Sequence, residues 1–106
     1  MEARVVIAEA NAGQLDDLAN FWDHEALQDI RGLDGNRGFL LLADPDTNRV
    51  IAISLWDTKE EAQAAGGKFQ EHAAQFQQFM SNEPSREDFD VRIGSFHETA
   101  IHPQPK

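Results

Sequence analysis

Apolar residues along the chain gather in four short runs, each flanked by residues that favour turns. The runs over residues 4–10, 39–43 and 50–56 are rich in branched or aromatic side chains and short for helices, which indicates β-strands. A fourth strand is predicted over residues 88–100, where apolar residues alternate with polar ones. The segment 44–48 holds Asp, Pro, Thr and Asn, so it predicts a turn that joins the second and third strands as a hairpin.

Two other segments have the three- and four-residue spacing of amphipathic helices. The apolar positions of the first are Leu15, Leu18, Ala19, Trp22 and Ala26. We expect Asn11 to cap the N-terminus of this helix. Thr58 and Glu61 form a capping box that begins the second helix, which Gly66 and Gly67 interrupt. Beyond the interruption, its apolar stripe continues at Phe69, His72, Ala73, Phe76 and Met80.

The resulting order, βαββαβ, predicts an α+β, ferredoxin-like fold with a four-stranded antiparallel sheet and two helices on one face. We expect a single domain over residues 1–101 and a flexible tail over 102–106. The first three strands are apolar at almost every position, so both faces of the sheet are predicted to be buried. Two helices cover only one face. A second copy of the sheet is the simplest cover for the other, which predicts a homodimer.

Composition excludes several classes of partner. The 106 residues include 9 basic and 19 acidic side chains, for a net charge of −10, which argues against binding to nucleic acids or anionic membranes. The chain has no cysteine and no apolar stretch of membrane-spanning length, so we expect a cytoplasmic protein. The spacing of its four histidines matches no metal motif, and we expect no metal site.

The middle of the chain, residues 35–62, reads as glycine, an aromatic residue, an apolar strand, an acidic turn and a second apolar strand. A Trp, an acidic residue, a Thr and a Glu-rich helix start follow. This order resembles the antibiotic-biosynthesis monooxygenase (ABM) family, as does the closing pattern Val91-x-Ile93-x-x-Phe96-x-Glu98. The resemblance implies a dimeric α/β barrel in which each subunit holds a hydrophobic, aromatic small molecule between sheet and helices. It also implies oxygenation of that molecule without a cofactor.

The family has two known sets of catalytic residues, and this chain matches each set at a single position. Trp56 matches the strand-end Trp of the polyketide-oxidising members, whereas Ala52 and Ala62 replace their Asn and their aromatic hydroxyl. His72 matches the helix His of the haem-degrading members after a small gap, whereas Ala65 replaces their Trp. Three interpretations therefore stay open: a cofactor-independent monooxygenase, a non-catalytic ligand-binding or accessory dimer, and a haem-binding or haem-degrading protein.

Five residues are candidates for the site. His72 shares a helix face with apolar residues, so we expect its ring to face the sheet, where a neutral imidazole accepts a proton at working pH. The alternative is a boundary histidine bonded to backbone or water. Trp56, Phe76, Phe69 and Trp22 are predicted to line a pocket for a flat aromatic ligand, with core packing as the alternative for Trp22.

Overall fold

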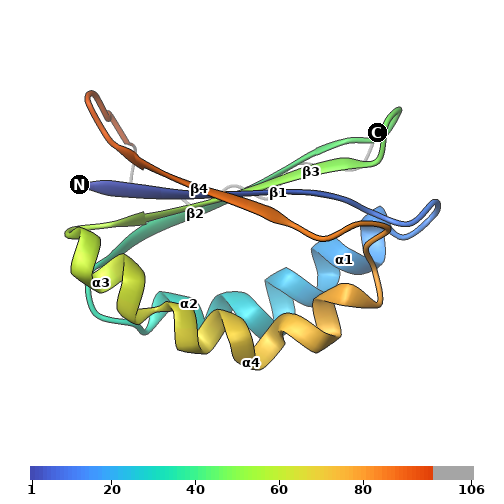
Figure 1. The fold of residues 1–106 in the computed structure, drawn as a ribbon, viewed down its shortest axis with the longest axis horizontal. Coiled ribbons are helices and arrows are strands. Elements are labelled where there is room, and N and C mark those ends of the chain that lie inside the picture. The colour runs from blue at the N-terminus through green and yellow to red at the C-terminus, as the bar shows by residue number, and fades with distance from the viewer. Residues whose placement is uncertain (97–106) are drawn as a thin grey trace.

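A computed structural model describes residues 1–96 of the chain (Figure 1). The elements are β1 (Glu2–Glu9), α1 (Leu15–Phe21), the π-helical segment η1 (Trp22–Ala26), α2 (Leu27–Arg31), β2 (Asn36–Asp44), β3 (Arg49–Trp56), α3 (Lys59–Ala64), α4 (Gly66–Gln77) and β4 (Ser85–Asp90). The predicted tail lies outside the described residues. No helix in the described range is long and apolar enough to cross a membrane.

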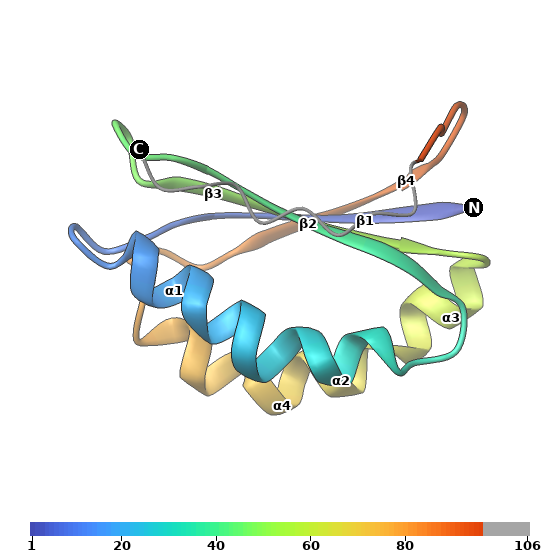
Figure 2. The same cartoon turned by 180° about the vertical axis from the view of Figure 1, so that it is seen from behind.

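The four strands form one antiparallel sheet in the order β2-β3-β1-β4. In the two central strands Val5 lies opposite Ile53, and on the other side of β1 it lies opposite Glu87 of β4. All helices pack against the same face of this sheet, as the front and back views show (Figure 1 and Figure 2). The predicted α+β, ferredoxin-like fold is confirmed.

The first predicted helix is a continuous helical segment that widens in its middle. Its buried side chains are Leu18, Trp22, Ala26 and Ile30, one at every fourth position. In a regular α-helix each four-residue step overshoots a full turn by about 40°, so the buried positions would drift away from the sheet. The wider turn of η1 counters this drift and keeps Trp22 and Ala26 in the core. Ala19, predicted in the apolar stripe, is exposed.

The second predicted helix begins as expected. The backbone N–H of Glu61 donates to Thr58 Oγ1 at 3.1 Å, which confirms the predicted cap. The helix is interrupted as predicted, but at Ala65: α3 ends at Ala64, and Gly66 and Gly67 form the first turn of α4. The Asn11 cap was wrong: α1 begins after Gln14, and the Asn11 side-chain amide instead donates to the carbonyl oxygen of Gln78 at 3.1 Å.

The last strand differs from its predicted span of residues 88–100. It starts three residues earlier, at Ser85, and ends at Asp90, while Ile93 is exposed. β4 is an edge strand whose side chains are all exposed, so its pairing with β1 comes from backbone hydrogen bonds rather than from apolar alternation. The apolar pattern that suggested a strand begins only at Phe89, near its end. His97 and Glu98 lie outside the described residues.

The sheet carries apolar residues on both faces. Its inner face, toward the helices, bears Val50, Ala52, Ser54 and Trp56 of β3, all buried. The outer face bears Val5, Ile7, Leu40, Leu42, Ile51, Ile53, Leu55 and Phe89, as the register requires. Leu40 is 51% exposed and Phe89 is 50% exposed in the single chain. Helices therefore cover one apolar face and leave the other open.

Candidate functional site

A cavity of about 460 Å³ lies between the inner face of the sheet and the helices. Its apolar walls include Val6, Ala8, Leu18, Trp22, Phe69 and Phe76. Its polar wall residues in the described chain are Arg4, Gln70, Gln77 and Arg86. This volume falls within the range of sites that enclose small organic molecules, and the mixture of apolar walls with few polar groups is typical of such sites.

The cavity exists because small sheet residues face large helix residues. On β1 and β3, Ala8 pairs with Val50 and Val6 pairs with Ala52, and all four line the cavity. All four side chains are small beside the rings of Trp22, Phe69 and Phe76 that line the same cavity. In a core packed to the usual density, larger residues would fill this space.

Aromatic rings form the helix side of the cavity. The indole of Trp22 lies at the centre of this wall, with its ring centroid 4.6 Å from Phe39 in a stacked arrangement and 4.5 Å from Phe76 in a tilted one. Phe69 adds a third ring at 6.2 Å from Trp22. Because each ring is held by its neighbours, the wall presents a rigid apolar surface suited to a flat ligand.

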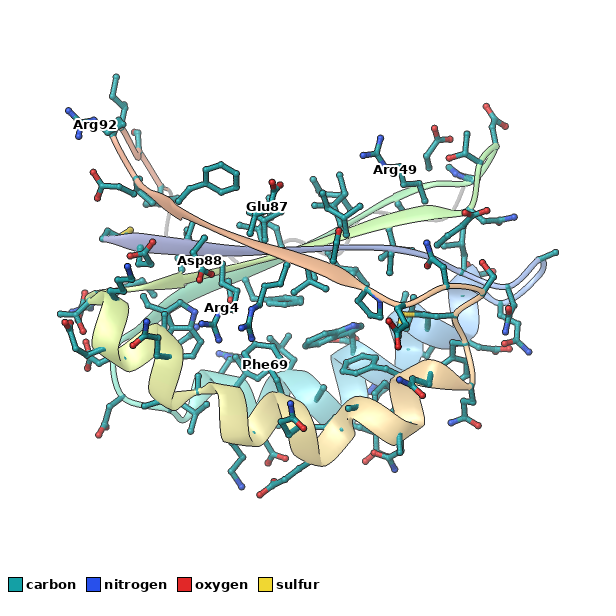
Figure 3. The ribbon with its side chains drawn as sticks, viewed as in Figure 1. Arg4, Arg49, Phe69, Glu87, Asp88 and Arg92 are labelled. Carbon is teal, nitrogen blue, oxygen red and sulfur yellow. The ribbon has the colours of Figure 1, made fainter. Side chains whose placement is uncertain are left out.

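Arg4 brings a positive charge to this apolar cavity. Its residue is only 3% exposed, and its Nε donates to Asp88 Oδ1 at 3.2 Å. Its Nη1 is buried and has no hydrogen-bond partner within the described chain. Figure 3 shows Arg4 and Asp88 on the helix side of the sheet and Phe69 reaching toward them from α4, whereas Glu87 and Arg49 lie on the outer side. A buried donor without an acceptor is costly in a folded protein, so this group is a strong marker of a site.

Three of the five candidate residues, Trp22, Phe69 and Phe76, line the cavity. Trp56 is not part of the cavity wall within residues 1–96. It is completely buried, and its Nε1 donates to Ser54 Oγ at 2.9 Å. The strand-end position suggested an open site, but Trp56 points inward and is enclosed in the core.

His72 lies between helices rather than against the sheet. Its Nε2 is 3.0 Å from Asp29 Oδ2 of α2, and its ring meets Phe21 edge-on at 5.9 Å. The predicted orientation was therefore wrong. At 100° per residue, His72 stands about 60° from Phe69 around the helix axis, on the side away from Ala73. The cavity lies on the Phe69 and Ala73 side, and His72 lies at the edge of the stripe that faces α2.

The sequence argument overlooked Arg4 because it opens an apolar strand, where a single charge is easily read as the strand's exposed start. The position of Arg4 along the strand is the signal that could have identified it. Arg4 has the same parity as Val6 and Ala8, so it faces the helices with them. Among residues 1–96, no group of three or more His, Cys, Asp or Glu side chains is placed to hold a metal ion.

Comparison with known proteins supports the fold. No family model matches the chain, and no curated protein matches it. Solved structures do. A proposed antibiotic biosynthesis monooxygenase from Nitrosomonas europaea is similar at a TM-score of 0.74 and 17% identity, covering 88% of this chain and 100% of the other. A monooxygenase of Streptomyces coelicolor in complex with nanaomycin D is similar at 0.75 and 14% identity, covering 92% of both chains.

The haem degrader MhuD of Mycobacterium tuberculosis, with two haems in its active site, is similar at a TM-score of 0.72 and 21% identity. That match covers 91% of this chain and 100% of the other. The chain thus has the ferredoxin-like fold of ABM proteins, which confirms the resemblance at the level of the fold. Proteins of this fold differ in what they bind, so the site must be judged on its own residues.

The position of Trp56 leads to a test of its role. We expect Ser54→Ala to lower the free energy of unfolding by about 1–3 kcal/mol, because it leaves the buried indole N–H without an acceptor. In a Trp56→Phe background the same substitution should cost much less, since no N–H is left to satisfy. Urea unfolding of the wild type, both single variants and the double variant measures the coupling. Equal costs in the two backgrounds would show that the Ser54–Trp56 bond does not stabilise the fold.

Proposed function

We propose that this protein binds a hydrophobic, aromatic small molecule in the cavity between its sheet and its helices. The observation that carries the proposal is the wall formed by Trp22, Phe69 and Phe76 around a space of about 460 Å³. Flat ligands bury apolar area against such rings and gain further from stacking or edge contacts. The S. coelicolor protein of the same fold is recorded with a ligand, nanaomycin D, which is consistent with this use of the fold.

Oxygenation of the bound molecule without a cofactor is the second candidate function. Two of the similar structures are described as monooxygenases, which favours it. The proton acceptor expected from the sequence, His72, is engaged with Asp29 instead and stands outside the cavity wall. Trp56, expected to position a substrate, is enclosed in the core. Binding is therefore the function that these residues support best, with catalysis as a separate question for experiment.

Haem is a poor fit to this site. Of the histidines within residues 1–96, His24 is exposed and His72 has its Nε2 within 3.0 Å of Asp29. Neither lines the cavity, so neither is placed to ligate an iron there. The proposal includes no cofactor, and it retains the cytoplasmic location expected for a cysteine-free chain.

We also propose that two copies pair through the outer face of the sheet. Leu40, Leu42 and Phe89 remain about half exposed on this face, beside a row of branched residues on the two central strands. Soluble monomers rarely leave a continuous apolar patch of this kind in contact with water. The dimer would bury it against an identical patch, as a two-fold interface requires.

Binding in the cavity is tested with N-phenyl-1-naphthylamine, an uncharged aromatic probe that fluoresces in apolar surroundings. We expect the wild type to bind it and Ala73→Phe to weaken binding about tenfold or more, because the added ring fills a volume that the probe needs. Ala74→Phe is the matched control. It is the next residue on α4, it is exposed, and it is not part of the described cavity wall. Equal affinity in the two variants would contradict binding at this site.

Oxygen uptake separates the two candidate functions. Hydroquinones and anthrones are added to the wild type and to the Ala73→Phe and Ala74→Phe variants, and dissolved oxygen is followed with an electrode. Uptake above the rate without protein that is lost only in Ala73→Phe would establish an oxygenase. His72 and Trp56 lie outside the cavity wall. We therefore expect His72→Ala and Trp56→Phe to take up oxygen at the wild-type rate. Binding without uptake identifies a non-catalytic binding protein.

Pairing through the sheet is tested by sedimentation velocity at micromolar concentration. We expect a dimer for the wild type and a monomer for Leu40→Lys, since the ammonium group would lie within an apolar interface. Gln63→Lys places the same charge on the exposed face of α3 and should leave the dimer intact. A wild type that sediments only as a monomer would overturn this part of the proposal.

A further inference from the structure

The charge of the cavity is opposite to that of the whole chain. The protein has a net charge of −10, yet the charged residues that line the cavity within the described chain are both arginines, Arg4 and Arg86. They lie on neighbouring strands of the same sheet face, since Arg86 pairs with Val6 and Arg4 pairs with Asp88. The cavity is therefore a positive site in an acidic protein.

The guanidinium of Arg4 is only partly satisfied. Asp88 accepts a hydrogen bond from Nε, and the Asp88 side chain is itself 34% exposed, so water shares that carboxylate. Arg4 Nη1 is buried without a partner in the described chain. An arginine offers five N–H donors, and burial removes the water that would otherwise accept from them. A buried charge in this state is stabilised by any acceptor that enters the cavity.

Gly66 lines the cavity close to this nitrogen. A Cβ at Gly66, in the first turn of α4, would lie 4.0 Å from Arg4 Nη1, at ordinary contact distance. At Gly67 an added Cβ would meet nothing within 4 Å. The first turn of α4 therefore approaches the guanidinium at Gly66 and not at Gly67.

We infer that the cavity selects an aromatic anion: a planar ring system with a negatively charged oxygen that accepts a hydrogen bond from Arg4 Nη1. The inference rests on the proposed binding of an aromatic molecule and adds the charge of that molecule. The ring system lies against Trp22 and Phe69, while the anionic oxygen accepts the hydrogen bond that no group of the described chain accepts from Nη1. Charge-assisted hydrogen bonds of this kind are the strong ones in proteins, and more so away from solvent. Arg86, exposed at the rim of the cavity, adds a second positive charge on the same side.

Two probes that share one aromatic skeleton isolate the effect of charge. One is 8-anilino-1-naphthalenesulfonate, an anion, and the other is the uncharged N-phenyl-1-naphthylamine. We expect the affinity of the wild type for the anion to be about tenfold higher, or more, than its affinity for the neutral probe. One charged hydrogen bond is enough to supply this difference. Arg4→Met should remove this preference while leaving neutral binding in place. Circular dichroism and a thermal melt establish that the variant is folded.

Two further substitutions give effects that a merely structural role for Arg4 would not produce. Asp88→Asn removes the negative charge beside the guanidinium, so it should tighten binding of the anion and leave the neutral probe unchanged. Gly66→Ala adds a methyl to the cavity lining 4.0 Å from Nη1, so it should weaken the anion more than Gly67→Ala, which adds a methyl where nothing lies within 4 Å. If Arg4→Met does not fold, the effect of Asp88→Asn on the two probes decides the question.

The outcomes separate this inference from the proposed function. If neither probe binds, or if Ala73→Phe binds both as tightly as the wild type, the aromatic site itself is refuted. If both probes bind in the cavity with equal affinity, or if Asp88→Asn changes the two affinities alike, the site stands and the selection of an anion is refuted. A preference for the anion that disappears in Arg4→Met and in Ala73→Phe supports both.

Discussion

The sheet is apolar on both faces, and the helices within residues 1–96 cover only one of them. Side chains alternate between the faces along every strand, so the register that buries Ala52 and Trp56 under the helices also turns Ile53 and Leu55 outward. A slip of one residue between β1 and β3 would reverse this arrangement for the whole of β1. The same register turns Arg4 toward the helices. The packing of the core, the open outer face and the charge in the cavity all follow from one strand pairing.

The cavity follows from how residue sizes are distributed across that inner face. The helices supply the large rings, the middle of β1 and β3 supplies alanine and valine, and the cavity lies between these two sets of residues. The widened turn at η1 holds Trp22 over this space. Trp56 shows the opposite case at the end of β3, where an indole from the sheet fills the gap and its N–H is satisfied by Ser54. One tryptophan closes the core, and the other forms the wall of a site.

Local patterns in the sequence were enough for the order of elements, the hairpin and the cap at Thr58, because each depends on residues close together in the chain. The start of β4 was not predictable in this way, since an exposed edge strand is held by backbone pairing and carries no apolar alternation. The site was predicted in part. Apolar periodicity identified Trp22, Phe69 and Phe76, but it does not say which edge of a helix stripe meets a neighbouring helix, and so it misplaced His72.

The negative net charge of the chain and the positive charge in its cavity act on a ligand over different distances. The net charge of −10 repels an anion from afar, but at physiological ionic strength that repulsion is screened beyond about 8 Å. The buried guanidinium of Arg4 acts on a ligand only at contact distance. Its interaction with an anion is stronger there because the surroundings are apolar, and salt screens it little. Asp88 already offsets part of its charge, and Nη1 has no hydrogen-bond partner among residues 1–96. This balance favours a ligand with a single negative charge and a large apolar body over small or highly charged anions, which would meet the same repulsion without gaining the contacts of the aromatic wall.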